Sequence, residues 1–314
     1  MNEYISNMLR IFYDINAGQI EKAQGGWSAD AYSVKTENIR YFLKVFDKHR
    51  NSTQFWISRI DYYMSVLFWL YDNTTFRDDL IMPVTARDGA YKFENADHVF
   101  MLYPYINGYT PADKKLSFTQ QQKLALIVSK LHKCSQEMPA NMLEDVENFD
   151  VSFCNELSSL IETKNNNKPL DTILTRYKQS LAENVEILKQ YAKELPEENL
   201  HFVLCHTDLH GWNLIQADKL FLLDWEGLKL APAEADIFSF TEGYFFDYAY
   251  DSFMNIYQHM FPNYIVNQKA ITFYRIRRRL EDITEFAKSI LFDNRSESDI
   301  NRSLEILTKE CSFL

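Results

Sequence analysis

Short runs of β-branched and aromatic residues dominate the first hundred positions of the chain. Such runs are typical of strands. They predict strands at residues 31–34, 41–46, 90–93 and 98–103, with a hairpin loop at 94–97. The stretch Gln24-Gly25-Gly26-Trp27 predicts a turn before the first strand. A longer apolar stretch predicts one helix in this half, at residues 53–71.

After residue 117 the apolar positions recur every three or four residues, which is the spacing of amphipathic helices. Thr119 and Gln122 fit a capping box at the start of the first of these helices. Between the helices, two short apolar runs predict a hairpin with strands at 214–215 and 220–223. The predicted helices cover residues 120–132, 171–194 and a C-terminal segment that includes 273–290.

These elements predict an α+β fold with two lobes: a small antiparallel-sheet lobe at residues 1–103 and a larger, mainly helical lobe at 104–314. Pro104 and Asn107-Gly108 interrupt regular structure near the boundary. The length of 314 residues agrees with two lobes at about 150 residues per domain. Hydrophobic residues make up 46% of the chain, which is enough for a packed core.

The net charge of -11 argues against a nucleic-acid partner, because binding to phosphates requires clustered lysine and arginine. It is compatible with a cationic substrate, although many soluble proteins are acidic. The four cysteines form no Cys-x-x-Cys pair. No secretory signal and no membrane span is visible, so we expect a cytoplasmic protein without a membrane partner. The pattern leaves monomer and dimer open.

One segment of the helical half carries a dense group of polar residues. His206, Asp208 and Asn213 follow the pattern H-x-D-x(4)-N, and Asp224 ends the second strand of the predicted hairpin. This is the layout of the catalytic and metal-binding segments of protein kinases. Asp208 would orient an acceptor hydroxyl and accept its proton. Asn213 and Asp224 would offer the oxygen ligands that Mg²⁺ prefers.

A second interpretation is that His206, Asp208 and His210 bind zinc or a pair of metal ions, as in metallohydrolases. The other histidines are isolated along the chain, without a second cluster of ligands. We favour phosphoryl transfer because the hairpin segment and the first half of the chain also fit it.

The segments at residues 205–215 and 222–237 resemble the aminoglycoside phosphotransferase and choline kinase family, and the likeness extends from Gly25-Gly26 to the C-terminal helix. The resemblance implies a protein-kinase-like fold, ATP or GTP with Mg²⁺, and a small-molecule hydroxyl as acceptor. It implies that Asp236 anchors the catalytic loop. The residues that it implies for the nucleotide are Gly25, Gly26, Lys44, Asp61, Tyr103 and Tyr105.

In this interpretation Gly25 and Gly26 cover the phosphates, and Lys44 pairs with the α- and β-phosphates. Asp61, on the helix after Lys44, takes the place of the usual glutamate as the partner of this lysine. Residues 101–105 form the hinge that contacts the base, with Tyr103 or Tyr105 packing on it.

The resemblance favours an amine-bearing acceptor, such as an aminoglycoside or an aminocyclitol like spectinomycin. The candidate substrate contacts are Glu226, His210, Trp212 and Asp247. Carboxylates of the C-terminal half could contact ammonium groups; these are Asp247, Asp251, Glu281, Asp282 and Glu285. The alternative is a metabolic kinase for choline, an amino alcohol, a sugar or methylthioribose, with the aromatic run 244–250 as a cation–π site. The presence of Lys44, Asp208, Asn213 and Asp224 argues against a catalytically inactive relative.

Overall fold

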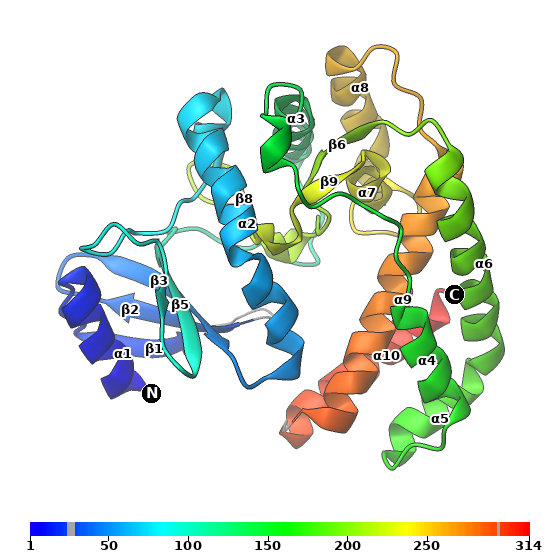
Figure 1. Ribbon diagram of the computed structural model, residues 1–314, viewed down its shortest axis with the longest axis horizontal. Helices are drawn as coiled ribbons and strands as arrows, with labels where there is room; N and C mark the ends of the chain where they lie inside the picture. Colours follow the sequence, from blue (N-terminus) through cyan, green and yellow to red (C-terminus); the bar gives the residue numbers. More distant parts are fainter. Residues whose placement is uncertain (24–28, 294–295) are drawn as a thin grey trace. The chain divides into compact units, whose positions relative to one another are not determined.

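The computed structural model describes residues 1–23, 29–293 and 296–314, and Figure 1 shows the arrangement of their elements. The predicted turn at Gln24-Gly25-Gly26-Trp27, with the two candidate phosphate-loop glycines, lies outside the described residues. The strands are β1 (Gln19–Ala23), β2 (Asp30–Lys35), β3 (Arg40–Asp47), β4 (Phe93–Glu94), β5 (His98–Pro104), β6 (Phe202–Cys205), β7 (Leu214–Gln216), β8 (Leu220–Leu222) and β9 (Lys229–Pro232).

The α-helices are α1 (Asn2–Met8), α2 (Asn51–Asn73), α3 (Phe118–Cys134), α4 (Phe153–Glu162), α5 (Lys168–Arg176), α6 (Lys178–Glu194), α7 (Glu234–Ile237), α8 (Tyr250–Met260), α9 (Gln268–Phe292) and α10 (Glu297–Ser312). Among the described helices, none combines the length and the hydropathy that a membrane span requires. The short turns used below are the π-helical η1 (Leu9–Tyr13) and the 3₁₀ turns η2 (Thr75–Asp79), η5 (Gly211–Asn213) and η6 (Trp225–Gly227).

The contacts of the chain group it into two compact units. The first comprises residues 1–134 and 208–228, and the second comprises 135–207 and 229–314. These units differ from the two lobes predicted from the sequence, because α3 and the β7–β8 hairpin group with the N-terminal sheet. The lobe boundary after residue 103 therefore remains a prediction.

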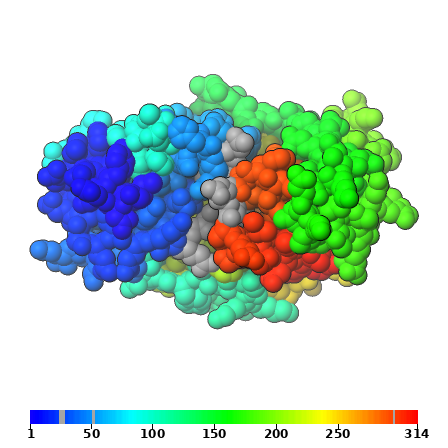
Figure 2. Space-filling model, turned by 90° about the horizontal axis from the view of Figure 1, so that it is seen from below, coloured from blue at the N-terminus to red at the C-terminus, as the bar shows by residue number. Residues whose placement is uncertain are grey.

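The first unit is organised around an antiparallel sheet with the strand order β1-β2-β3-β5-β4 among the described residues. Alternate side chains of the sheet pack against α1 and η1, where Ile5 and Leu9 are fully buried. The opposite face carries Lys44, which pairs across the strands with Ala31 and Met101. In Figure 2 the residues of α1 lie on the surface of this unit, in dark blue. One face of the sheet thus packs on α1 and η1, and the other carries Lys44 beside buried apolar residues such as Met101 and Phe46.

Most of the predicted strands and the hairpin are confirmed; β4 is shorter than expected, and the strands β1, β6 and β9 were not predicted. The strand expected at 90–93 is reduced to β4 at Phe93–Glu94. The edge strand β1 was not predicted, because its mostly polar sequence, QIEKA, lacks the apolar alternation of a half-buried strand. Edge strands tolerate such residues since one side faces solvent.

The helices also depart from the prediction at their ends. Helix α3 begins two residues early, and its capping box consists of Ser117 and Gln120 instead of Thr119 and Gln122. The helix predicted at 171–194 is divided into α5 and α6 at Tyr177, whose backbone leaves the helical region. Asn167 begins α5 by accepting the amide hydrogen of Leu170 at 3.1 Å. Side-chain caps therefore decide helix ends that periodicity leaves open.

The second unit is built around α9, which packs against α4, α6, α7 and α10 (Figure 1). The expected apolar positions of α9 are buried at Phe273, Leu280, Ile283 and Ala287, as the periodicity predicts. Strands β6 and β9 form an antiparallel pair in the same unit.

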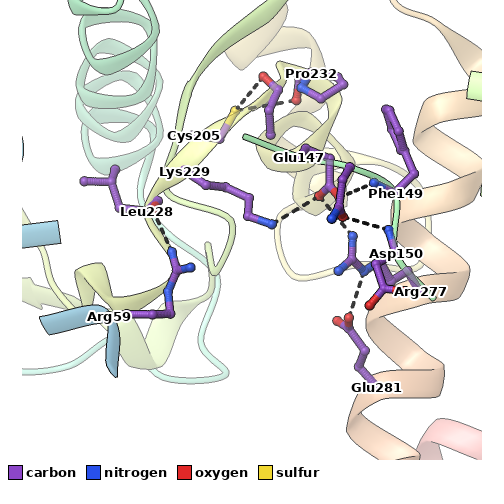
Figure 3. Close-up of polar contacts among 12 residues, drawn as sticks. Arg59, Glu147, Phe149, Asp150, Cys205, Leu228, Lys229, Pro232, Arg277 and Glu281 are labelled. Carbon is purple, nitrogen blue, oxygen red and sulfur yellow. Dashed lines mark hydrogen bonds and ion pairs between the residues drawn. The ribbon is translucent and has the colours of Figure 1, made fainter. Parts of the chain in front are cut away.

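A buried ion cluster connects α9 to β9 within the second unit (Figure 3). The carboxylate of Glu147 contacts Arg277 at 2.9 Å and Lys229 at 3.5 Å, and its other oxygen accepts the amide hydrogen of Phe149 at 2.7 Å. Burial alone would raise the pKa of Glu147, but the charges of Arg277 and Lys229 outweigh it and lower the pKa below its ordinary value. Glu147 is therefore ionised at neutral pH.

We expect Glu147→Gln to lower the free energy of unfolding by about 3–5 kcal/mol at pH 7, because it leaves Arg277 and Lys229 without their buried anion. Since the pKa of Glu147 is lower in the folded state, its contribution is present above the ordinary glutamate pKa and is lost as the pH falls through the folded value. Urea unfolding of both proteins from pH 7 to 3 measures this. A stability difference that does not shrink on acidification would contradict the assigned role.

Candidate functional site

The side chain of Lys44 lies between two carboxylates at the end of the β7–β8 hairpin. Its ammonium contacts Asp224, and it contacts Glu226 at 2.6 Å. All three residues belong to the first unit, although Lys44 and Asp224 are 180 positions apart. Lys44 and Glu226 are mostly buried, with side chains 18% and 7% exposed, so solvent screens this cluster only weakly.

The protonation of this cluster follows from burial and from the neighbouring charges. Burial would lower the pKa of Lys44, but Asp224 and Glu226 outweigh burial and raise it. Burial would raise the pKa of Asp224, yet Lys44 lowers it below the ordinary value. Burial, together with the charge of Asp224, raises the pKa of Glu226. Lys44 and Asp224 are therefore the charged pair, and Glu226 is the group that takes up a proton.

Asp208 is held by two residues of the loop that follows it. The side-chain nitrogen of Asn213 donates to the carboxylate of Asp208 at 2.9 Å and to its backbone carbonyl at 3.0 Å. His210 approaches the other carboxylate oxygen at 3.4 Å. The amide hydrogen of Leu223 bonds to the carbonyl of Asn213 at 2.9 Å, which joins this loop to the residue before Asp224. The negative charge of Asp208 acts to raise the pKa of Asp224, against the stronger effect of Lys44.

Two residues of these segments have left-handed backbone conformations, which cost about 1–3 kcal/mol each for residues other than glycine. Thr207 has φ 68° and Asp224 has φ 69°. The fully buried Asp236 stabilises the first of them, because its carboxylate accepts the amide hydrogens of Thr207 at 2.6 Å and His206 at 2.9 Å. These hydrogen bonds confirm the predicted anchoring role of Asp236, immediately before Asp208 in the chain.

The predicted catalytic loop and strand β7 also pack against residues 109–112 of the first unit. Tyr109 and Gln216 exchange two backbone hydrogen bonds of 2.9 Å, and the amide hydrogen of Ala112 bonds to the carbonyl of Gly211 at 3.1 Å. A Cβ atom on Gly211 would overlap the carbonyl oxygen of Ala112. Glycine is therefore required here because two backbones approach closely.

We expect Gly211→Ala to lower the free energy of unfolding by about 1–3 kcal/mol, the usual cost of overpacking, and to displace η5 with Asn213. Gly18→Ala is the matched control, since a Cβ atom there would meet only an ordinary contact with the Lys35 carbonyl oxygen at 3.5 Å. Thermal unfolding of both variants measures the difference. Equal midpoints for the two variants would contradict the close approach.

The two tyrosines of the predicted hinge have different neighbours. Tyr103, on β5, faces Phe42 across the strands and lies near the Lys44 cluster, where burial raises its pKa. Tyr105 packs under the guanidinium of Arg40, 3.9 Å from the ring centroid. Neither contact tests whether these rings bind a base, so that role remains a proposal.

The predicted ion pair between Lys44 and Asp61 is not formed. Asp61 lies on α2 with its side chain 70% exposed, and it pairs with Lys92 at 2.6 Å and with the Tyr91 hydroxyl. Lys44 takes Asp224 and Glu226 as its carboxylate partners instead. The shorter aspartate side chain faces solvent, whereas the hairpin brings two carboxylates to the lysine.

The candidate substrate residues are dispersed. Glu226 is buried against Lys44, and His210 lies beside Asp208. Trp212 is 44% exposed and donates its indole hydrogen to Asp113 at 3.3 Å. Asp247 is exposed and belongs to the second unit. In the first unit the structure therefore gathers Lys44, Asp208, His210, Asn213, Asp224 and Glu226.

Sequence reasoning missed two residues that hold the segment after Asp224. The ring of Phe76, on η2, packs edge-on against Trp225 with 5.9 Å between the ring centroids. Arg59, on α2, donates to the backbone carbonyl oxygens of Glu226 at 2.7 Å and Leu228 at 2.8 Å. The only available signal for Arg59 was a lone cation in the helix after Lys44, which periodicity cannot distinguish from a solvated residue.

A strand lysine in an antiparallel sheet, a catalytic-loop aspartate and asparagine, and an aspartate after the following hairpin are the parts that kinase-like phosphotransferases share. The chain belongs to the phosphotransferase enzyme family, whose model matches residues 19–261. It is thus an enzyme of the phosphotransferase class, and the metallohydrolase interpretation is set aside.

Solved structures support the same fold. A spectinomycin phosphotransferase in complex with ADP and spectinomycin has a TM-score of 0.78 at 19% identity, covering 98% of this chain and 93% of that one. A choline kinase from Streptococcus pneumoniae has a TM-score of 0.64 at 16% identity, covering 100% and 99%. A microcompartment-associated aminopropanol kinase has a TM-score of 0.64 at 17% identity, covering 99% and 95%. The curated proteins yielded no match.

Proposed function

We propose that this enzyme transfers the γ-phosphoryl group of ATP, or of GTP, to a hydroxyl group of a small molecule. The observation that carries the proposal is the convergence of Lys44, Asp224 and the Asp208–Asn213 pair within one compact unit. Phosphoryl transfer depends mainly on positioning and on neutralising phosphate charge. The cation of Lys44 beside Asp224, and the carboxylate of Asp208 held by the amide of Asn213, supply groups for both tasks.

Each residue has a role in this proposal. Asp208 orients the acceptor hydroxyl and accepts its proton, and the amide of Asn213 holds its carboxylate. Lys44 contacts the α- and β-phosphates. Asp224 and Asn213 fit Mg²⁺, because a carboxylate and an amide oxygen are the hard donors that this ion prefers. When bound, Mg²⁺ would neutralise charge on the phosphate oxygens.

The nucleotide base and phosphates would use the remaining residues of the sheet. Tyr103 and Tyr105 are proposed to pack on the base, and Gly25 and Gly26 to cover the phosphates. Two similar structures are complexes of spectinomycin phosphotransferase, one with ADP and one with AMP, which supports an adenine nucleotide. We place the reaction in the cytoplasm, where nucleotide and Mg²⁺ are abundant; the four free thiols suit that reducing compartment. Monomer and dimer are both compatible with the proposal.

For the acceptor, we propose an amine-bearing antibiotic of the aminocyclitol or aminoglycoside class, in line with the likeness to spectinomycin phosphotransferase. Glu226, His210, Trp212 and Asp247 remain candidate contacts. Three acidic residues of α9 are weaker candidates than the sequence suggested, because they already form ion pairs within their helix. These pairs are Glu281 with Arg277, Asp282 with Arg278, and Glu285 with Lys288.

A metabolic amino-alcohol kinase is the second candidate, favoured by the similarity to choline and aminopropanol kinases. The predicted cation–π site is less favourable than the sequence suggested. The ring of Tyr244 already lies 4.8 Å from the Arg279 guanidinium and 5.5 Å from that of Arg275. A quaternary amine at this ring would lie near these cations and would be repelled by their charges.

The test is a coupled ADP-release assay with ATP, Mg²⁺ and a panel of acceptors. The panel contains spectinomycin, several aminoglycosides, choline, aminopropanol, methylthioribose and simple sugars. Turnover with one acceptor class identifies the substrate and supports the kinase proposal. If the purified protein neither binds ATP in calorimetry nor releases ADP with any acceptor, the proposed function is wrong.

A further inference from the structure

Arg59 of helix α2 forms hydrogen bonds to the segment from Asp224 to Leu228. Arg59 donates its Nε hydrogen to the carbonyl of Glu226 at 2.7 Å and an Nη2 hydrogen to the carbonyl of Leu228 at 2.8 Å; Figure 3 shows the latter contact. All three residues belong to the first unit. The planar guanidinium therefore holds two carbonyls at once, which lysine cannot reproduce.

The two carbonyls lie at the carboxyl end of η6, the turn that begins immediately after Asp224. Carbonyl oxygens at the end of a helical turn lack partners within the turn, and a cation placed there satisfies them. Asp224 itself has φ 69° and ψ 66°, a left-handed conformation that a residue other than glycine keeps only when its surroundings enforce it. Arg59 acts on the backbone two to four residues beyond this position.

Helix α2 offers no carboxylate for Lys44 among its described side chains. Its two acidic residues, Asp61 and Asp72, are both exposed, and Asp61 pairs with Lys92. The contact between α2 and the polar cluster is instead indirect. Arg59 holds the backbone of Glu226, and the side chain of Glu226 holds Lys44 at 2.6 Å.

We propose that Arg59 is a positioning residue for phosphoryl transfer: it couples α2 to the carboxylates of Asp224 and Glu226, in place of an ion pair between α2 and Lys44. This inference rests on the proposed kinase function. Phe76, packed on Trp225, supports the same segment from η2. The specific contribution of Arg59 is to fix the backbone that carries Asp224, the proposed metal ligand, and Glu226, which contacts Lys44.

The first test compares Arg59→Lys, Arg59→Met and the control Arg10→Met. Arg10 is exposed in the same unit, and among the described residues its side chain makes one marginal hydrogen bond, to Asn7 at 3.5 Å. Loss of groups that orient metal ligands typically costs 10- to 100-fold in metal affinity or activity. We expect both Arg59 variants to lower kcat by about 10- to 100-fold, to raise the Mg²⁺ concentration for half-maximal rate, and to leave the acceptor KM within about threefold.

The second test does not depend on turnover. Hydrogen–deuterium exchange of the nucleotide-free protein should show faster exchange in peptides covering residues 224–228 of the Arg59 variants, with unchanged exchange in α1 and β1–β3. The Arg10 variant should match the wild type. Wild-type kinetics and exchange in both Arg59 variants would overturn the positioning role. A wild-type protein without turnover would instead refute the kinase function, while exchange would still report on the Arg59 contacts.

Discussion

Replacing Asp208 by asparagine is expected to reduce kcat by at least about 100-fold, and up to about 10,000-fold, the range found for a positioned general base. The substitution keeps the size of the side chain and removes the group that accepts the proton of the acceptor hydroxyl. The nucleotide KM should change little, because Lys44 and Asp224 remain in place. Steady-state rates from the ADP-release assay measure both quantities.

Asp218→Asn is the matched control for this substitution. Asp218 lies in the exposed turn of the β7–β8 hairpin, where it accepts the amide hydrogen of Lys219 at 3.0 Å. This variant should keep wild-type rates. An Asp208→Asn enzyme that transfers phosphate at the wild-type rate would show that another group accepts the proton, and it would remove Asp208 from the mechanism.

Replacing Lys44 by alanine is expected to affect both catalysis and stability. The enzyme loses a cation at the phosphates, so kcat/KM for the nucleotide should fall by about 100- to 1,000-fold, as for other lost transition-state donors. It also leaves Asp224 and Glu226 together without their cation, so unfolding free energy should fall by up to about 3 kcal/mol. Urea unfolding and initial rates at varied ATP measure the two effects.

A second substitution separates these effects. In Lys44→Ala/Asp224→Asn the carboxylate that is charged in this cluster is also neutral, so stability should recover while activity stays low. Lys48→Ala is the control, because Lys48 directly follows the strand that carries Lys44 and forms an ion pair with Glu94 at 2.5 Å. If Lys44→Ala keeps full nucleotide affinity and stability, the cluster has neither of the roles proposed for it.

The sequence predicted best those elements whose hydrophobic pattern repeats over many neighbouring residues. The helical periodicity of 273–290 and the hairpin at 214–223 were predicted because their patterns repeat over neighbouring residues. The capping box moved from Thr119 to Ser117, and Tyr177 divided one predicted helix into two. The end of a helix depends on one capping side chain or on the backbone angles of one residue. A hydrophobic pattern read over many positions does not reveal such a single residue.

The sequence by itself determined the family and the candidate groups, because the spacing of His206, Asp208, Asn213 and Asp224 is local and unusual. It could not assign their partners. Asp61 and Glu226 are both acidic residues near a motif, and only the packed sheet and hairpin show that Glu226 contacts Lys44 while Asp61 faces solvent. Contacts such as these join residues more than 160 positions apart. They arise from packing in three dimensions, so only the tertiary structure decided them.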